Sequence, residues 1–144
     1  MTEITPIFEK IDSTFPFKKY EFNSGIQELD DFFYKGSNAF IKYGYSQMYI
    51  LRESDKANII GYFTLSSSTI QWDESLSIEK MTRYVPGILL GMFAIDKRFR
   101  RKKFGSDLIK KAVTIALKIS KEKIDKTTIK MYFDLFKIKN PSIS

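Results

Sequence analysis

Hydrophobic residues along this chain change their spacing several times, and each change predicts a different element. Gln47–Leu51 and Asn58–Ile70 are rich in β-branched and aromatic residues, as strands usually are. The polar segment Arg52–Asn58 between them predicts a hairpin loop. Ile88–Asp96 is apolar on both alternating sets of positions, which predicts a strand near the centre of a sheet.

Helical spacing occurs in two regions. Apolar residues recur at mixed helical intervals from Ile26 to about Tyr43, which predicts one or two helices with Gly36 as a break. A further helix is predicted from Gly105 to about Lys118. Its core side is expected to carry Leu108, Ala112, Ile115 and Ile119. Its solvent side is expected to carry Lys110, Lys111 and Lys118.

The remaining segments are less regular. Phe17–Phe22 is interpreted as an opening strand, Gln71–Tyr84 as a loop with a helical turn at Ser77–Met81, and Thr127–Phe133 as a last strand. Residues 134–144 form a basic tail to which no structure is assigned. The order of elements predicts one α+β domain over residues 1–144, with a mixed, mostly antiparallel twisted sheet flanked by helices.

The amino-acid composition excludes several kinds of chemistry. The 144 residues include no Cys and no His. A disulfide framework, a cysteine nucleophile, a Cys/His zinc site and a histidine-dependent serine triad are therefore excluded, and no metal site is predicted. The N-terminus lacks the basic start and apolar core of a signal peptide, and no apolar run approaches the roughly 20 residues that span a bilayer. We expect a soluble, cytoplasmic protein without a membrane partner.

Positive charge gathers at one informative place. The formal net charge is +7, which favours an anionic partner, although a lysine-rich genome would give the same balance. Arg100, Arg101, Lys102 and Lys103 stand between the predicted strand and the predicted helix. A helix N-terminus exposes unpaired backbone N–H groups, so this turn predicts a phosphate-binding site. The alternative is a solvated basic turn before a surface helix.

Three segments of the chain have a distinctive sequence: FNSGIQELDDF at Phe22–Phe32, IGYFTLS at Ile60–Ser66 and LLGMFAID at Leu89–Asp96. Together they resemble the GNAT superfamily of acyl-CoA N-acetyltransferases, in particular the toxin-like branch encoded beside ribbon-helix-helix antitoxins. Their order and spacing carry the resemblance, which extends over about residues 17–120. It implies a GNAT-like fold and transfer of an acetyl group from acetyl-CoA to a primary amine, such as that of an aminoacyl-tRNA.

The resemblance also implies a cofactor site. The strand residues Phe93, Ala94 and Ile95 are expected to pair with the pantetheine arm. The following loop is expected to wrap the pyrophosphate; its residues are Arg100, Arg101, Lys102, Lys103, Phe104, Gly105 and Ser106. Arg101 and Lys103 stand where the family has its first two glycines. Their side chains are expected either to obstruct the phosphate cradle or to compensate by contacting phosphate directly.

The end of the chain departs from the family pattern. The family's C-terminal tyrosine motif cannot be placed, so Tyr132 is assigned as the candidate general acid, and the fold is interpreted as shortened. Tyr62 and Ser66 are predicted acceptor-site residues, the alternative being one polar face of a strand. Predicted partners are acetyl-CoA, tRNA or another polyanion, an antitoxin-like protein and a second copy of the chain. The alternative function is a degenerate, non-catalytic GNAT fold that binds nucleic acid or protein.

Overall fold

The computed structural model describes residues 3–71 and 84–119, with four strands and three α-helices in those ranges. The strands are β1 (Pro6–Ile11), β2 (Gln47–Glu53), β3 (Ile59–Gln71) and β4 (Tyr84–Ile95). They form one sheet in the order β1-β2-β3-β4, and each neighbouring pair is antiparallel. The helices are α1 (Gln27–Asp31), α2 (Ser37–Lys42) and α3 (Phe104–Ile119).

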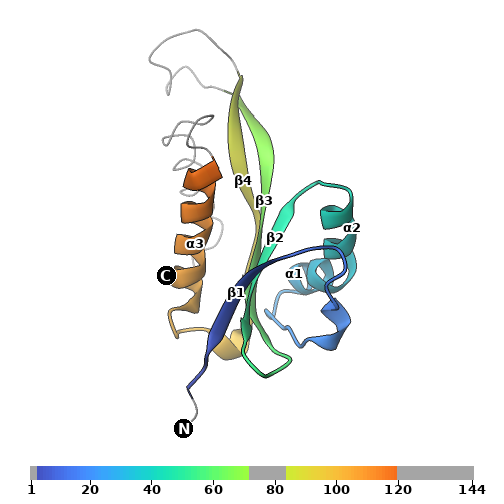
Figure 1. Ribbon diagram of the computed structural model, residues 1–144, viewed down its shortest axis with the longest axis vertical. Coiled ribbons are helices and arrows are strands. Elements are labelled where there is room, and N and C mark those ends of the chain that lie inside the picture. The colour runs from blue at the N-terminus through green and yellow to red at the C-terminus, as the bar shows by residue number, and fades with distance from the viewer. Residues whose placement is uncertain (1–2, 72–83, 120–144) are drawn as a thin grey trace.

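The helices lie on opposite faces of the sheet, as Figure 1 shows: α3 covers one face, and α1 and α2 lie against the other. Each face therefore has its own apolar core. Phe63, Phe93 and Leu108 belong to the core under α3, whereas Phe33, Ile50 and Tyr62 belong to the core under α1 and α2. This mixed α+β arrangement with an antiparallel sheet confirms the predicted fold class. The single domain over residues 1–144 stays a prediction.

The predicted helical region from Ile26 to Tyr43 is continuous but irregular. A π-helical segment, Phe32–Gly36, joins α1 to α2. The Ser37 hydroxyl donates a 2.9 Å hydrogen bond to the Phe32 carbonyl five residues earlier. A Cβ at Gly36 would lie 3.0 Å from the Phe32 ring, so glycine gives this ring its space. The predicted break at Gly36 is therefore a local widening of the helix.

The predicted opening strand at Phe17–Phe22 is wrong. Phe17–Lys19 forms a 3₁₀ turn, and the first strand is β1, which is earlier in the chain. Phe17 and Phe22 are buried in the core under α1 and α2. These positions are therefore apolar because an irregular segment packs into the core, and not because they belong to a strand. The sequence pattern does not predict β1, because β1 lies at one edge of the described sheet and Ile11 is its single buried residue.

Two further boundaries differ from the prediction. β4 begins at Tyr84, before the predicted Ile88, because Pro86 and Gly87 pair with Thr69 and Ser68 of β3. The predicted helical turn at Ser77–Met81, the predicted strand at Thr127–Phe133 and the basic tail lie outside the described residues. The central position of β4 therefore stays a prediction. Within the described ranges, no helix is long and apolar enough to cross a membrane.

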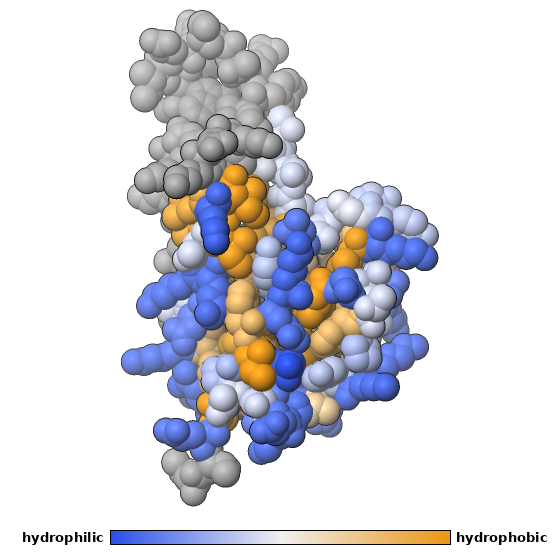
Figure 2. Space-filling model, viewed as in Figure 1, coloured by the Kyte–Doolittle hydropathy of each residue, from blue (hydrophilic) through white to orange (hydrophobic). Residues whose placement is uncertain are grey.

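Helix α3 has the predicted extent to within one residue, but its buried stripe is shifted. Leu108, Ile109, Ala112 and Ala116 are buried, whereas Ile119 is half exposed. Lys110, Lys111 and Lys118 are exposed as predicted. The predicted burial of Ile119 is wrong, because the last turn of α3 extends beyond the core. Figure 2 shows orange, apolar surface in the upper part of the α3 side of the molecule, next to hydrophilic side chains.

Candidate functional site

The turn between β4 and α3 is a backbone cradle in which left-handed residues alternate along the chain. Arg100 is extended, with φ −68° and ψ 157°. Arg101 and Lys103 have φ of 62° and 68°, and α3 begins at the next residue, Phe104. Left-handed backbone is unfavourable for residues with a Cβ, by roughly 1–2 kcal/mol each. The turn thus keeps the left-handed conformation at both positions where the resemblance implies glycine.

The cradle opens onto the N-terminus of α3 and is surrounded by positive charge. The first N–H groups of a helix have no intrahelical partner, and here they belong to Phe104, Gly105 and Ser106. Arg101, Lys102 and Lys103 are exposed, and none of them forms an ion pair within the described ranges. Successive N–H groups in such turns form concave anion sites. The arrangement therefore fits a phosphate group.

A buried carboxylate holds this turn against the N-terminal half of the chain. Asp96 is 0% exposed, and its Oδ2 accepts a 2.8 Å hydrogen bond from the Asn23 N–H. Lys97 returns a 2.9 Å bond from its N–H to the Asn23 carbonyl. The Arg100 guanidinium donates to the Ser24 carbonyl, and Ser24 in turn donates from N and Oγ to Asp30. The segment at Phe22–Phe32 thus positions the turn, while the N-cap of α1 itself is Ile26.

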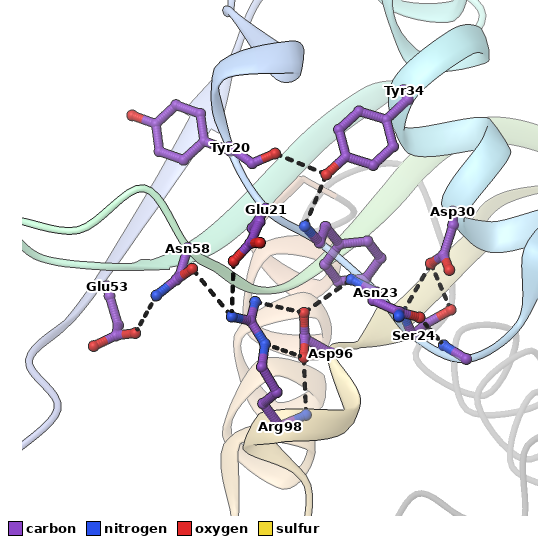
Figure 3. A network of polar contacts seen from close by, with 12 residues as sticks. Tyr20, Glu21, Asn23, Ser24, Asp30, Tyr34, Glu53, Asn58, Asp96 and Arg98 are labelled. Carbon is purple, nitrogen blue, oxygen red and sulfur yellow. Dashed lines mark hydrogen bonds and ion pairs between the residues drawn. The ribbon is translucent and has the colours of Figure 1, made fainter.

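Arg98 neutralises this buried carboxylate, as Figure 3 shows. Its Nε and Nη2 each donate a 2.9 Å bond to Asp96, and its Nη1 reaches Glu21 and Asn58 at 3.2 Å. Burial alone raises the pKa of Asp96, but the bonds from Arg98 and Asn23 and the attraction of the guanidinium outweigh it. The pKa of Asp96 is therefore held below its usual value. The carboxylate stays ionised and orients the turn.

β4 carries a bulge five residues before this turn. Phe63 faces Phe93 and Leu65 faces Leu90, so Gly91 and Met92 together stand opposite Thr64. The Thr64 hydroxyl accepts a 2.9 Å hydrogen bond from the Met92 N–H. A Cβ at Gly91 would lie 2.9 Å from that hydroxyl, which favours glycine there. The bulge also moves the apolar side of β4: Leu90 and Phe93 both pack under α3.

The strand after the bulge presents alternate residues to its two edges. The Asp96 N–H donates to the Ile60 carbonyl of β3 at 2.8 Å. In an antiparallel ladder the hydrogen-bonded pairs alternate with non-bonded pairs. The backbone groups of Ala94 therefore face β3, whereas those of Phe93 and Ile95 face the opposite edge of β4. Of the predicted strand residues, Phe93 and Ile95 have the orientation that pairing with an extended ligand requires.

A pocket of about 630 Å³ opens at the other end of the sheet, where β2 begins. Its lining includes Ser66 and Leu65 of β3, Ile88 of β4, and Tyr45 and Ser46 of the α2–β2 turn. Leu65 directly follows Thr64, so one lining residue of the pocket is next to the bulge in the sequence. Ile88 at the pocket is seven residues before Ile95, where β4 ends, which at about 3.3 Å per strand residue is roughly 23 Å. Ser66 is thus at the pocket, as an acceptor residue would be.

Tyr62, unlike Ser66, lies in the core and not at the pocket. Tyr62 is 0% exposed, and its hydroxyl donates a 2.7 Å bond to the Leu29 carbonyl. Burial raises its pKa above the usual value for tyrosine. Tyr62 is therefore a core residue that does not reach the pocket, while Tyr132 lies outside the described residues. Sequence reasoning missed the bulge that places the Thr64 hydroxyl, and it missed Arg98, whose partners are distant in the chain.

The fold of the chain is similar to that of solved bacterial toxin structures. No family model matches the chain. It is 28% identical over 92 residues to the probable toxin TacT of Sinorhizobium fredii, covering 61% of this chain and 51% of that protein. The chain thus spans about half the length of this curated relative.

Solved toxin structures share the fold at lower identity. AtaT complexed with acetyl-methionyl-tRNAfMet superposes with a TM-score of 0.70 at 19% identity, over 82% of this chain and 72% of that chain. An AtaT mutant bound to the C-terminus of the antitoxin AtaR and acetyl-CoA gives 0.66 at 21% identity, over 80% and 68%. The resemblance to the toxin-like branch and the predicted fold are confirmed.

Proposed function

We propose that this protein is an acetyl-CoA-dependent N-acetyltransferase that acts on the primary amine of an aminoacyl-tRNA. The observation that carries the proposal is the left-handed backbone of Arg101 and Lys103 at the mouth of α3. Strain of this kind persists only where surrounding structure holds it, and it gathers at ligand sites. Here the Asp96–Arg98 pair and the Arg100 contact hold it. The fold shared with toxins that bind acetyl-CoA and an acetylated tRNA supports the same reaction.

The residues of the cradle have separate roles in this proposal. The N–H groups of Phe104, Gly105 and Ser106 and the charges of Arg101, Lys102 and Lys103 bind the pyrophosphate. Phe93 and Ile95 pair their backbone with the extended arm. Acetyl-CoA supplies a thioester: the amine forms a C–N bond as the C–S bond breaks, the amine gives up a proton, and the thiolate takes one. The reaction lies near the bulge at Thr64, beside the pocket that receives the acceptor, and Tyr132 remains the predicted acid.

The test is calorimetric titration of the purified protein with acetyl-CoA. Micromolar affinity is the expected result, and the variant Gly105→Trp, which crowds the cradle, is expected to lose binding. The charge-reversed pair Lys102→Glu and Lys103→Glu is a second variant. Its matched control is the pair Lys110→Glu and Lys118→Glu, two exposed lysines of the following helix α3. Equal affinity of both charge-reversed proteins would place the cofactor elsewhere. No binding by the wild type would favour the non-catalytic alternative.

Two partners and a cellular location are also proposed, and the relatives support the first partner. An antitoxin-like protein is expected to bind this chain, as AtaR binds AtaT. A homodimer and a cytoplasmic location remain proposals as well. Co-purification with the product of a neighbouring ribbon-helix-helix gene tests the first, and sedimentation analysis tests the second.

A further inference from the structure

Three aromatic rings gather on the surface at the end of α2, and together they are called the α2 aromatic cluster. Its members are Phe40, Tyr43 and Tyr45, which are 42%, 66% and 66% exposed. The rings of Phe40 and Tyr45 meet edge to face, with centroids 5.6 Å apart. The centroids of Tyr43 and Tyr45 lie 6.4 Å apart. Packing among the described residues therefore leaves much of this aromatic surface exposed.

The backbone holds these rings in fixed positions. Gly44 follows α2 with φ of 74°, and its N–H donates to the Ile41 carbonyl at 3.1 Å. The Tyr45 N–H donates to the Phe40 carbonyl at 2.9 Å. This pair of bonds is a Schellman motif, which usually brings a contact between the third-last helical residue and the second residue after the helix cap. The motif accounts for the Phe40–Tyr45 contact, but it does not require the exposed faces of Tyr43 and Tyr45.

Positive charge and the pocket adjoin the cluster. The Lys42 ammonium lies 5.8 Å from the centroid of the Tyr43 ring. Tyr45 lines the pocket, whose lining also includes Lys10, Asp12 and Ser66. The pocket thus connects the cluster to the strand residues beside the bulge. Lys10 and Lys42 attract phosphate, whereas Asp12 attracts an ammonium group.

We propose that the α2 aromatic cluster stacks the bases at the single-stranded end of an RNA whose terminal aminoacyl group enters the pocket. This inference rests on the proposed function, because it names the surface through which the acceptor is recognised. Aromatic rings beside a cation bind single-stranded nucleic acid independently of sequence, since every base has a π face. A duplex buries those faces and is not bound in this way.

The experiment measures the affinity of a fluorescein-labelled single-stranded RNA of about six nucleotides by anisotropy. Stacking is expected to make the double variant Tyr43→Ala/Tyr45→Ala bind at least about fivefold more weakly. Tyr43→Phe/Tyr45→Phe keeps the rings and is expected to bind within about twofold of the wild type. Tyr43→Leu/Tyr45→Leu keeps apolar surface without a π face and is expected to bind as weakly as the alanine variant. Lys42→Gln should weaken RNA binding more than Lys18→Gln, because Lys18 is exposed but does not line the pocket.

Three results would overturn this inference: undiminished RNA affinity of the alanine variant, wild-type affinity of the leucine variant, or equally tight binding of a blunt RNA duplex. A change in sedimentation of the alanine variant, with RNA binding intact, would assign the surface to contact between copies. Acetyl-CoA titration of the same variants separates this inference from the proposed function. Unchanged acetyl-CoA binding with lost RNA binding supports both, whereas RNA binding without any acetyl-CoA binding supports the cluster and contradicts the enzyme.

Discussion

The Met92 N–H donates a 2.9 Å hydrogen bond to the Thr64 hydroxyl. At this bulge β4 has one residue more than β3, and the Thr64 side chain accepts the bond that a backbone carbonyl of β3 accepts elsewhere in the ladder. Thr64 is 4% exposed, so no water replaces it readily. Because the bulge reverses the alternation of β4, this bond sets which residues between it and the cradle face α3. It therefore connects the geometry of the pocket to that of the cradle.

Replacing Thr64 by valine should test this bond. Valine keeps the shape of threonine but leaves the Met92 N–H without its acceptor, and a buried unpaired donor costs about 1–3 kcal/mol. Thr64→Ser keeps the hydroxyl, so its free energy of unfolding should fall clearly less than that of Thr64→Val. Urea unfolding of the three proteins measures the difference. Equal stability of Thr64→Val and the wild type would mean that the hydroxyl is dispensable at the bulge.

Gly61 should tolerate no side chain. A Cβ there would lie 2.5 Å from Ile95 Cδ1 and 2.8 Å from the Ala94 carbonyl oxygen. The backbone oxygen has no room to move within the sheet, so Gly61→Ala should cost about 1–3 kcal/mol by overpacking. Gly25→Ala is the comparison, because its Cβ meets nothing within 4 Å and only its φ of 83° is unfavourable. Thermal unfolding should show a larger fall in Tm for Gly61→Ala than for Gly25→Ala.

Lys103→Gly should stabilise the fold even though it removes a charge. Left-handed backbone costs a residue with a Cβ roughly 1–2 kcal/mol, whereas added flexibility of glycine costs about 0.5–1 kcal/mol. Lys102→Gly removes the same charge from the same turn without a positive φ and should destabilise instead. Urea titration distinguishes the two.

The same pair of variants decides how the cations act on the cofactor. If Lys103 obstructs the cradle, Lys103→Gly should bind acetyl-CoA more tightly than Lys102→Gly. If its ammonium contacts phosphate, the order of affinities should be reversed. Calorimetry with acetyl-CoA gives the order directly.

Ionised Asp96 should stabilise the fold, so the free energy of unfolding should fall as acid protonates this carboxylate. Its folded-state pKa lies below the unfolded value of about 3.9, so its contribution is present above that value and is lost as the pH falls through the folded pKa. Asp96→Asn should be much less stable than the wild type near neutral pH, and this gap should narrow below about pH 4. Asp31→Asn is the control, since Asp31 pairs with Lys35 at the surface, at 3.8 Å. A gap that stays constant in acid would contradict the assigned ionisation of Asp96.

The sequence by itself determined the elements whose signals are local. The content of β-branched and aromatic residues located β2 and β3, and the spacing of apolar residues located α3. The cluster of cations located the turn before α3. Composition, spacing and charge are local signals that need no knowledge of distant neighbours. Local spacing failed for β1, whose edge position leaves its pattern mixed, and for Ile119, whose helix reaches beyond the core.

Only the tertiary structure decided the conformation of the candidate site. Arg101 and Lys103 carry a Cβ and therefore disfavour left-handed backbone, so these two residue types alone would not predict the left-handed conformation of the cradle. That conformation is held by contacts between distant segments, such as the bond of Asn23 to Asp96 across 73 residues. The bulge at Thr64 and the burial of Tyr62 likewise depend on how β3 meets β4 and the helices. Such contacts form only when the chain folds, and no local pattern encodes them.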